Sequence, residues 1–233
     1  MKLALRHLAQ AGVAIAAIAI AQPAAAEIID FESGFAALDP VGAVVTATNT
    51  VTFSVGPGTT GGVGPAFIAD VGGPTTAFVP HDTPEAGAAG RIGEFFLTDE
   101  TAGPSAALNY FIEFADPVAS LGLDLIDFRR DGGPSAGDTA TLTVYSDSFS
   151  TAVGFDIFTI PLTNPVDGNV ERLMVSLGGK VIKSASIVFS TPDVGTGIDN
   201  ITFVPEPATL ALLGIGLAGI GAGRRRRARP ARG

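Results

Sequence analysis

The chain has 233 residues, with 23 acidic and 14 basic side chains, no cysteine and no tryptophan. The lack of cysteine excludes disulfides, thiol nucleophiles and cysteine-ligated zinc. Eight basic residues lie in segments 1–26 and 206–233, so residues 27–205 keep 22 acidic and 6 basic side chains, a net charge of −16. Such an acidic surface repels phosphates, which excludes nucleic acid as a partner.

The first 26 residues have the layout of a secretory signal peptide. Lys2 and Arg6 give a basic start, residues 8–21 are apolar, and three alanines at 24–26 offer the small residues of a cleavage site. We predict that signal peptidase cuts between Ala26 and Glu27. The alternative, a permanent N-terminal membrane anchor, requires a longer apolar run than this one.

Residues 27–203 are predicted to form one all-β domain. Short runs rich in Val, Ile, Phe and Thr alternate with Gly, Pro and Asp, which is typical of strands joined by turns. No stretch keeps an apolar period of 3.6 residues for three turns without Gly or Pro, so helices are not expected. About a dozen short strands predict a two-sheet sandwich, specifically a jelly roll. The predicted strands are 28–31, 44–55, 66–69, 76–79, 91–98, 108–114, 119–128, 139–145, 155–161, 171–177, 184–189 and 197–203.

Acidic side chains near both ends of this domain form a candidate metal site. Asp30 and Glu32 flank an early phenylalanine, and Asp199 belongs to the late run 197–203, Gly-Ile-Asp-Asn-Ile-Thr-Phe. This pairing resembles the two ends of bacterial carbohydrate-binding jelly-roll modules. The resemblance implies that Asp30, Glu32 and Asp199 help to hold a structural Ca²⁺, a cation that prefers oxygen ligands. Alternatively, these residues serve turns and strand ends through local hydrogen bonds.

A secreted hydrolase acting on polysaccharides or esters is the alternative function. After signal removal one histidine remains, His81, followed by Asp82, and a serine with this histidine would make a triad. However, no serine stands in a Gly-x-Ser-x-Gly context. Asp124 and Asp127 have an odd separation within one predicted strand, which places them on opposite faces and prevents them from acting as a pair. We therefore predict no catalytic residue and no enzyme activity.

The last thirty residues read as a membrane anchor. An apolar run at 208–222 is followed by four consecutive arginines, Arg224, Arg225, Arg226 and Arg227. A spanning helix needs about 20 apolar residues, so this run predicts a short transmembrane helix. Because arginine clusters stay on the cytoplasmic side, the preceding domain is expected to face outward.

The residues directly before this apolar run indicate what kind of anchor it is. Pro205, Glu206 and Pro207, the short Gly/Ala/Leu helix and the arginine cluster together resemble the PEP-CTERM sorting signal of Gram-negative bacteria over residues 204–229, with 230–233 as a tail. The resemblance implies that exosortase, a membrane-embedded cysteine transpeptidase, recognises the Pro-Glu-Pro motif and cuts near it. A plain single-span anchor is the alternative interpretation.

The same resemblance implies a location and a partner. Proteins with this signal accompany the production of exopolysaccharide or biofilm matrix. We therefore expect an exported, non-catalytic protein, anchored transiently in the inner membrane, then held at the cell surface or in the matrix and contacting exopolysaccharide.

Overall fold

The computed structural model describes residues 25–71, 90–99, 108–128, 136–160, 169–178, 181–191 and 196–206. Ala26–Pro205 forms one compact unit. The predicted signal peptide, the transmembrane helix, the arginine cluster Arg224–Arg227 and the pair His81–Asp82 lie outside the described residues. Within the described residues, no helix is long and apolar enough to cross a membrane.

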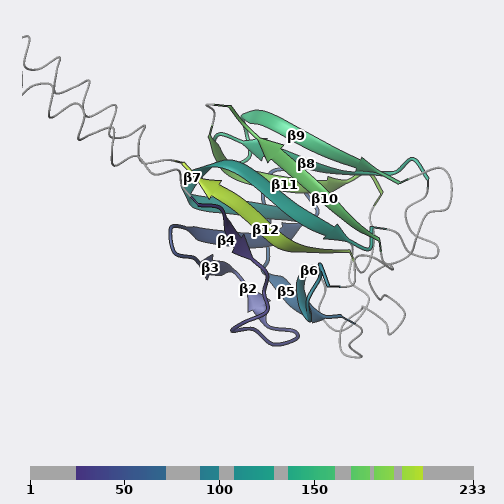
Figure 1. The fold of residues 1–233 in the computed structure, drawn as a ribbon. Coiled ribbons are helices and arrows are strands. Elements are labelled where there is room, and N and C mark those ends of the chain that lie inside the picture. Colours follow the sequence, from purple (N-terminus) through teal and green to yellow (C-terminus); the bar gives the residue numbers. More distant parts are fainter. Residues whose placement is uncertain are drawn as a thin grey trace, which may run out of the picture. The chain divides into compact units, whose positions relative to one another are not determined.

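The described part is all β, as predicted, with twelve strands joined in antiparallel pairs (Figure 1). The strands are β1 (Glu27–Ile29), β2 (Pro40–Val41), β3 (Ala43–Val45), β4 (Thr50–Gly56), β5 (Ala66–Asp70), β6 (Phe95–Thr98), β7 (Asn109–Ile126), β8 (Thr139–Tyr145), β9 (Ala152–Thr159), β10 (Val170–Ser176), β11 (Ile182–Phe189) and β12 (Gly197–Pro205).

The twelve strands form one continuous hydrogen-bonded sheet. It folds into two layers, the first and the second sheet of the sandwich, and strand β7 runs through both (Figure 1). Its first half, residues 109–114, pairs with β4 and β11, and the first sheet continues through β8 to β9. Its second half, residues 118–126, lies between β10 and β12, and the second sheet continues through β6, β5 and β2. The late strands β11 and β12 thus insert between earlier ones (Figure 1). This interleaving gives the predicted two-sheet sandwich its jelly-roll connectivity.

One hydrophobic core lies between the two sheets. In β8, Ala140, Leu142 and Val144 are fully buried, whereas the alternate threonines are partly exposed, as their two-residue period predicts. The rings of Phe114 in the first sheet and Phe203 in the second have centroids 5.4 Å apart. These aromatic contacts join the two sheets across the core.

Four predicted strands differ clearly from the observed ones. The predicted strand 44–55 is a hairpin of β3 and β4, because Thr46 and Asn49 close a turn through a backbone hydrogen bond of 2.9 Å. The predicted strands 108–114 and 119–128 are a single strand, β7, and the register shift opposite β11 falls near Pro117, where a missing N–H is tolerated. Of the predicted strand 91–98, only Phe95–Thr98 forms a strand, which is β6.

A second, smaller core covers the outer face of the second sheet. Ile126 and Val170 are partners in the β7–β10 register, and they pack with Ala69, Ile92 and Phe96. Residues 90–94 therefore fold over the outer face of the sheet before β6 begins. This cover buries polar residues of β7 and β12 that would otherwise face solvent.

Candidate functional site

The sorting motif begins inside the sandwich. Strand β12 continues two residues beyond the predicted domain boundary at residue 203, to Pro205. Val204 stands opposite Ser120 and Pro205 opposite the fully buried Val118 of β7. Glu206 follows directly and Pro207 lies outside the described residues. The folded domain and the predicted Pro-Glu-Pro motif therefore share a residue, with no linker between them.

The opposite end of the domain meets β12 at the same place. Strand β1 begins at Glu27, the residue that follows the predicted signal-peptide cut after Ala26. It pairs only with the last part of β12, and its register puts Glu27 opposite Phe203 and Ile29 opposite Ile201. Both expected processing sites thus lie beside one strand pair.

Asp199 lies deep in the second sheet, opposite Asp124 of β7. Its side chain is 1% exposed, and neither carboxylate oxygen accepts a hydrogen bond. Burial raises the pKa of Asp199 to about 8; the Asn200 backbone amide opposes this shift without reaching hydrogen-bond geometry, and the charges of Glu32, Asp124 and Asp30 reinforce it. Asp199 is therefore mainly protonated at neutral pH.

The other two predicted calcium ligands lie near Asp199 but have local tasks. Glu32 accepts hydrogen bonds from the backbone amides of Glu94 (3.0 Å) and Phe95 (3.1 Å), so it fastens the segment that precedes β6. Asp30 accepts a bond of 3.3 Å from the Glu32 amide. Between them, Phe31 has a positive φ of 56° and a buried ring. This turn directs the aromatic side chain into the core, while both carboxylates stay exposed.

Of the three predicted calcium ligands, Asp199 is suited to bind Ca²⁺, whereas Glu32 is already engaged in other hydrogen bonds. The two unused, buried oxygens of Asp199 suit a cation. Both Glu32 oxygens, in contrast, are already bound by backbone amides. Among the described residues, no group of three or more Asp, Glu or His side chains is arranged to hold a metal. The calcium site at Asp30, Glu32 and Asp199 stays a prediction.

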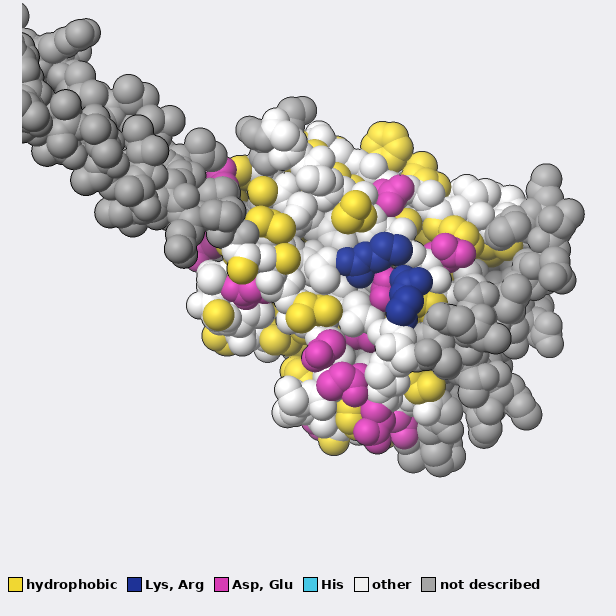
Figure 2. Space-filling view, viewed as in Figure 1, with side chains coloured by type: hydrophobic (Ala, Val, Ile, Leu, Met, Phe, Trp, Pro, Cys, Tyr) yellow, Lys and Arg dark blue, Asp and Glu magenta, His cyan; other side chains and the backbone are white. Residues whose placement is uncertain are grey.

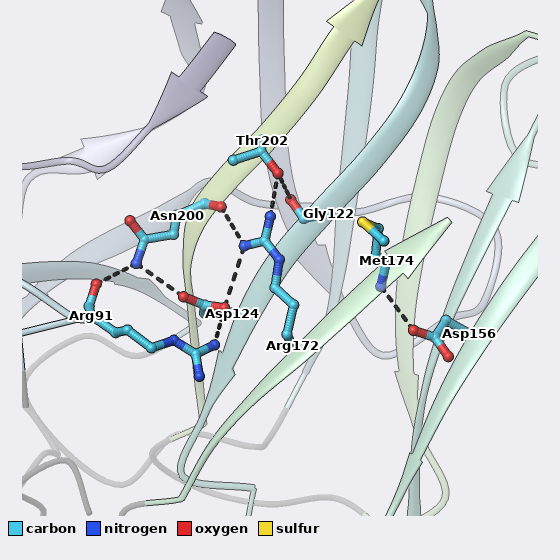
Figure 3. A network of polar contacts seen from close by, with 8 residues as sticks. All are labelled: Arg91, Gly122, Asp124, Asp156, Arg172, Met174, Asn200 and Thr202. Atoms are coloured by element: carbon cyan, nitrogen blue, oxygen red, sulfur yellow. Dashed lines mark hydrogen bonds and ion pairs between the residues drawn. The ribbon is translucent and has the colours of Figure 1, made fainter. Parts of the chain in front are cut away.

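Asp124 is the centre of a polar network that the sequence analysis missed (Figure 3). One of its oxygens contacts Arg91 Nη2 at 2.6 Å and Arg172 Nη1 at 3.3 Å. The other accepts a bond of 3.0 Å from Asn200 Nδ2. Because the Asp124 side chain is only 4% exposed, its charge requires these partners.

Arg172 is held more firmly than Arg91. Its guanidinium also donates to the Asn200 carbonyl oxygen at 2.9 Å and to Thr202 Oγ1 (Figure 3). It lies against Gly122, where a Cβ atom would come within 2.6 Å of Arg172 Nη2. Because Gly122 has no side chain, the guanidinium can pack directly against its backbone. The only signal in the sequence was the rarity of basic side chains in the domain, six against 22 acidic ones.

Asp127, the other member of the considered carboxylate pair, lies beyond β7, which ends at Ile126. Its φ is 51°, which is not an extended conformation. The predicted placement of Asp124 and Asp127 on opposite faces of one strand therefore does not apply. The Asp127 amide donates to the Asn169 carbonyl oxygen at 2.8 Å. Both Asp124 and Asp127 are buried, which leaves neither carboxylate open to a substrate.

A third feature lies where β9 and β10 come side by side. Asp156 of β9 accepts a hydrogen bond from the Met174 amide of β10 at 2.8 Å (Figure 3). It accepts another from the Ile157 amide at 2.9 Å. Around this bridge, Phe155, Met174 and Ile157 are 68%, 60% and 46% exposed. Figure 2 shows the two neighbouring basic side chains and scattered apolar side chains on the same face of the domain. We call Phe155, Ile157 and Met174 the apolar patch.

Comparison with known proteins adds one specific match. No curated protein sequence matches the chain. Among solved structures, the K1 cleaved adhesin domain of Lys-gingipain from Porphyromonas gingivalis W83 is similar with a TM-score of 0.35 and 13% identity, over 78% of this chain and 99% of that one. Residues 203–227 match the model of the PEP-CTERM protein-sorting motif. The chain carries a PEP-CTERM sorting motif that starts on β12, the last strand of its sandwich.

Proposed function

We propose that the protein is an exported, non-catalytic component of the cell surface or extracellular matrix of a Gram-negative bacterium. Exosortase releases it from the inner membrane. The observation that carries this proposal is the sorting motif at residues 203–227, which follows directly on a folded, acidic β-sandwich. The motif implies export and anchoring before processing, and the sandwich is then the part that remains outside.

The apolar patch supports contact with exopolysaccharide. Phe155, Ile157 and Met174 expose large apolar side chains on two neighbouring strands, and such clusters mark interaction surfaces. An exposed aromatic ring can stack against the C–H face of a sugar. The hydroxyl groups of the same sugar can pair with polar neighbours such as Thr143, which stands opposite Phe155 in the β8–β9 register. We assign the polysaccharide contact to this patch.

The two carboxyl groups with strongly shifted pKa values favour structural roles. Asp199 is sealed beneath the outer face of the second sheet. In Asp147 the pKa is held below its usual range by hydrogen bonds from the Ser150 and Thr151 hydroxyls and amides, which close its own turn. Neither arrangement presents an acid or base to a substrate.

The sorting step is tested in the producing bacterium. The native protein is compared with a variant carrying Pro205→Ala, Glu206→Ala and Pro207→Ala, by intact mass and by cell fraction. We expect the native form to lose the arginine cluster and reach the surface, and the variant to stay in the inner membrane with its full tail. A matched variant, Thr209→Ala, lies just beyond the motif and should be processed normally.

Two outcomes would contradict the proposal. If the native protein and the triple variant both keep the full tail in the inner membrane, the tail is a plain anchor. If the purified protein turns over substrates from a library of polysaccharides and esters, the protein is a hydrolase and the non-catalytic assignment is wrong.

A further inference from the structure

We propose that exosortase cuts this protein on the C-terminal side of Pro205, so that the mature chain keeps the whole of β12. This inference rests on the proposed processing by exosortase and specifies where the cut falls. It follows from how the last residues of β12 are held.

Both neighbours of β12 hold its end. Phe203 pairs with Glu27 of β1 on one side and with Leu121 of β7 on the other. Its side chain is 1% exposed, and its ring packs against Phe114. The preceding Thr202 is also paired with both strands and is bound by Arg172.

Among the described residues, β7 is the only strand that pairs with the last two residues of β12. Val204 stands opposite Ser120, and after a register shift Pro205 stands opposite Val118. Both residues are half-buried. Pro205 ends the strand, and Glu206 is the first residue outside it.

A peptidase binds several residues on each side of the scissile bond in an extended form, so a paired strand must open locally before it is cut. A cut before Pro205 needs the segment around Phe203 in the active site. That opening removes Phe203 from the core and breaks the β1–β12 pair. A cut several residues beyond Pro205 leaves the paired residues up to Phe203 in place.

The reaction balances with an acceptor of either of two kinds. The scissile C–N bond breaks, and the nitrogen leaves with the released tail as an amine. The carbonyl carbon of the retained chain bonds either to the oxygen of water, which gives a carboxylate, or to the nitrogen of an amine acceptor, which gives a new amide.

The test is mass spectrometry of the mature protein isolated from the producing bacterium, with sequencing of its C-terminal peptide. We expect a chain that begins at Glu27 and still contains Pro205, with a free carboxylate or an amine acceptor attached. A mature C-terminus at Val204 or earlier would overturn the inference while leaving exosortase processing intact. A full-length C-terminus would overturn both.

A second measurement tests the physical basis without exosortase. The purified full chain is treated with a broad-specificity protease, and the mass of the resistant core is determined. We expect a core that extends through Pro205, because β12 is held to that residue. A resistant core that ends at Phe203 or earlier would show that the sandwich does not protect this segment, and the inference would fail.

Discussion

Glu27 stands directly opposite Phe203 in the antiparallel pair of β1 and β12. The residue that starts the predicted mature chain and the residue that starts the sorting motif are therefore neighbours across one ladder. The first and the last strand of the described sandwich are therefore neighbours in one sheet. A domain with this layout can fold while either end is still attached to a membrane.

Replacement of Asp199 by Asn should remove a pH dependence of stability. The folded-state pKa of about 8 lies above the ordinary value of 3.8 for an aspartic acid, so the folded protein binds an extra proton between these two pH values. The free energy of unfolding should fall as pH rises through this window, by at most about 1.4 kcal/mol per pH unit. Urea unfolding at pH 5, 7 and 9 in chelator measures this slope. We expect the slope in the native protein and in Asp116→Asn, and a flatter profile in Asp199→Asn; equal slopes in all three would contradict the assignment.

Calcium binding by Asp30, Glu32 and Asp199 predicts a different response of the same variant. Extracellular calcium modules bind with dissociation constants on the order of 1 mM. Calcium at several times this concentration should raise the melting temperature of the native protein and of Asp116→Asn, and leave Asp199→Asn unchanged. The measurement is thermal unfolding at pH 7 with calcium, with magnesium and with chelator. A native melting temperature that does not respond to calcium would remove the predicted site.

The two arginines around Asp124 should differ in their contribution to stability. Arg172→Ala removes three hydrogen-bonded contacts and leaves a buried charge partly unpaired, which should cost about 3 kcal/mol. Arg91 is 45% exposed, so solvent screens its ion pair, and Arg91→Ala should cost about 1 kcal/mol or less. Urea unfolding at pH 7 compares the two. An equal or larger loss for Arg91→Ala would contradict the conclusion that Arg172 is the more firmly held of the two arginines.

Phe155→Ala tests the apolar patch. Its ring is 68% exposed, so truncation should change the free energy of unfolding by about 0.5 kcal/mol or less. If the ring stacks on sugars, affinity for exopolysaccharide purified from the producing bacterium should fall about tenfold, as expected for loss of a central aromatic contact. Val63→Ala removes an exposed apolar side chain elsewhere (84%) and serves as the control. Unchanged binding by Phe155→Ala would exclude this patch as the contact.

The fold class was predictable because each strand buries one face, so apolar and polar residues alternate along its sequence with a period of two. In β8, the alternation of Ala140, Leu142 and Val144 with threonines is visible in the sequence and holds in the structure. Strand limits were less predictable. Pro117 suggests a break, yet β7 continues through it because the strand changes partners at that point and the ladder needs no N–H there.

The polar network was not predictable from local patterns. Arg172 and Asp124 are 48 positions apart, and they meet because β10 and β7 pair in one register, which a one-residue slip would abolish. Arg91 comes from a segment folded over the sheet, a placement that depends on Ile92 and Phe96 reaching the second core. The sorting motif, in contrast, is a contiguous signal, and its position was predicted without any structure.

The Asp156 bridge bears on how copies of this protein behave when crowded outside the cell. Strands at sheet edges are the usual points where β proteins join one another, because their free amides invite a foreign strand. β9 and β10 are two such edges, and they expose the apolar side chains of Phe155, Ile157 and Met174. Asp156 occupies the amides of Met174 and Ile157 and adds a negative charge beside the apolar patch. By occupying these amides and adding a charge, the Asp156 carboxylate disfavours the pairing of a strand from another copy at this edge. The apolar patch itself stays exposed to other ligands.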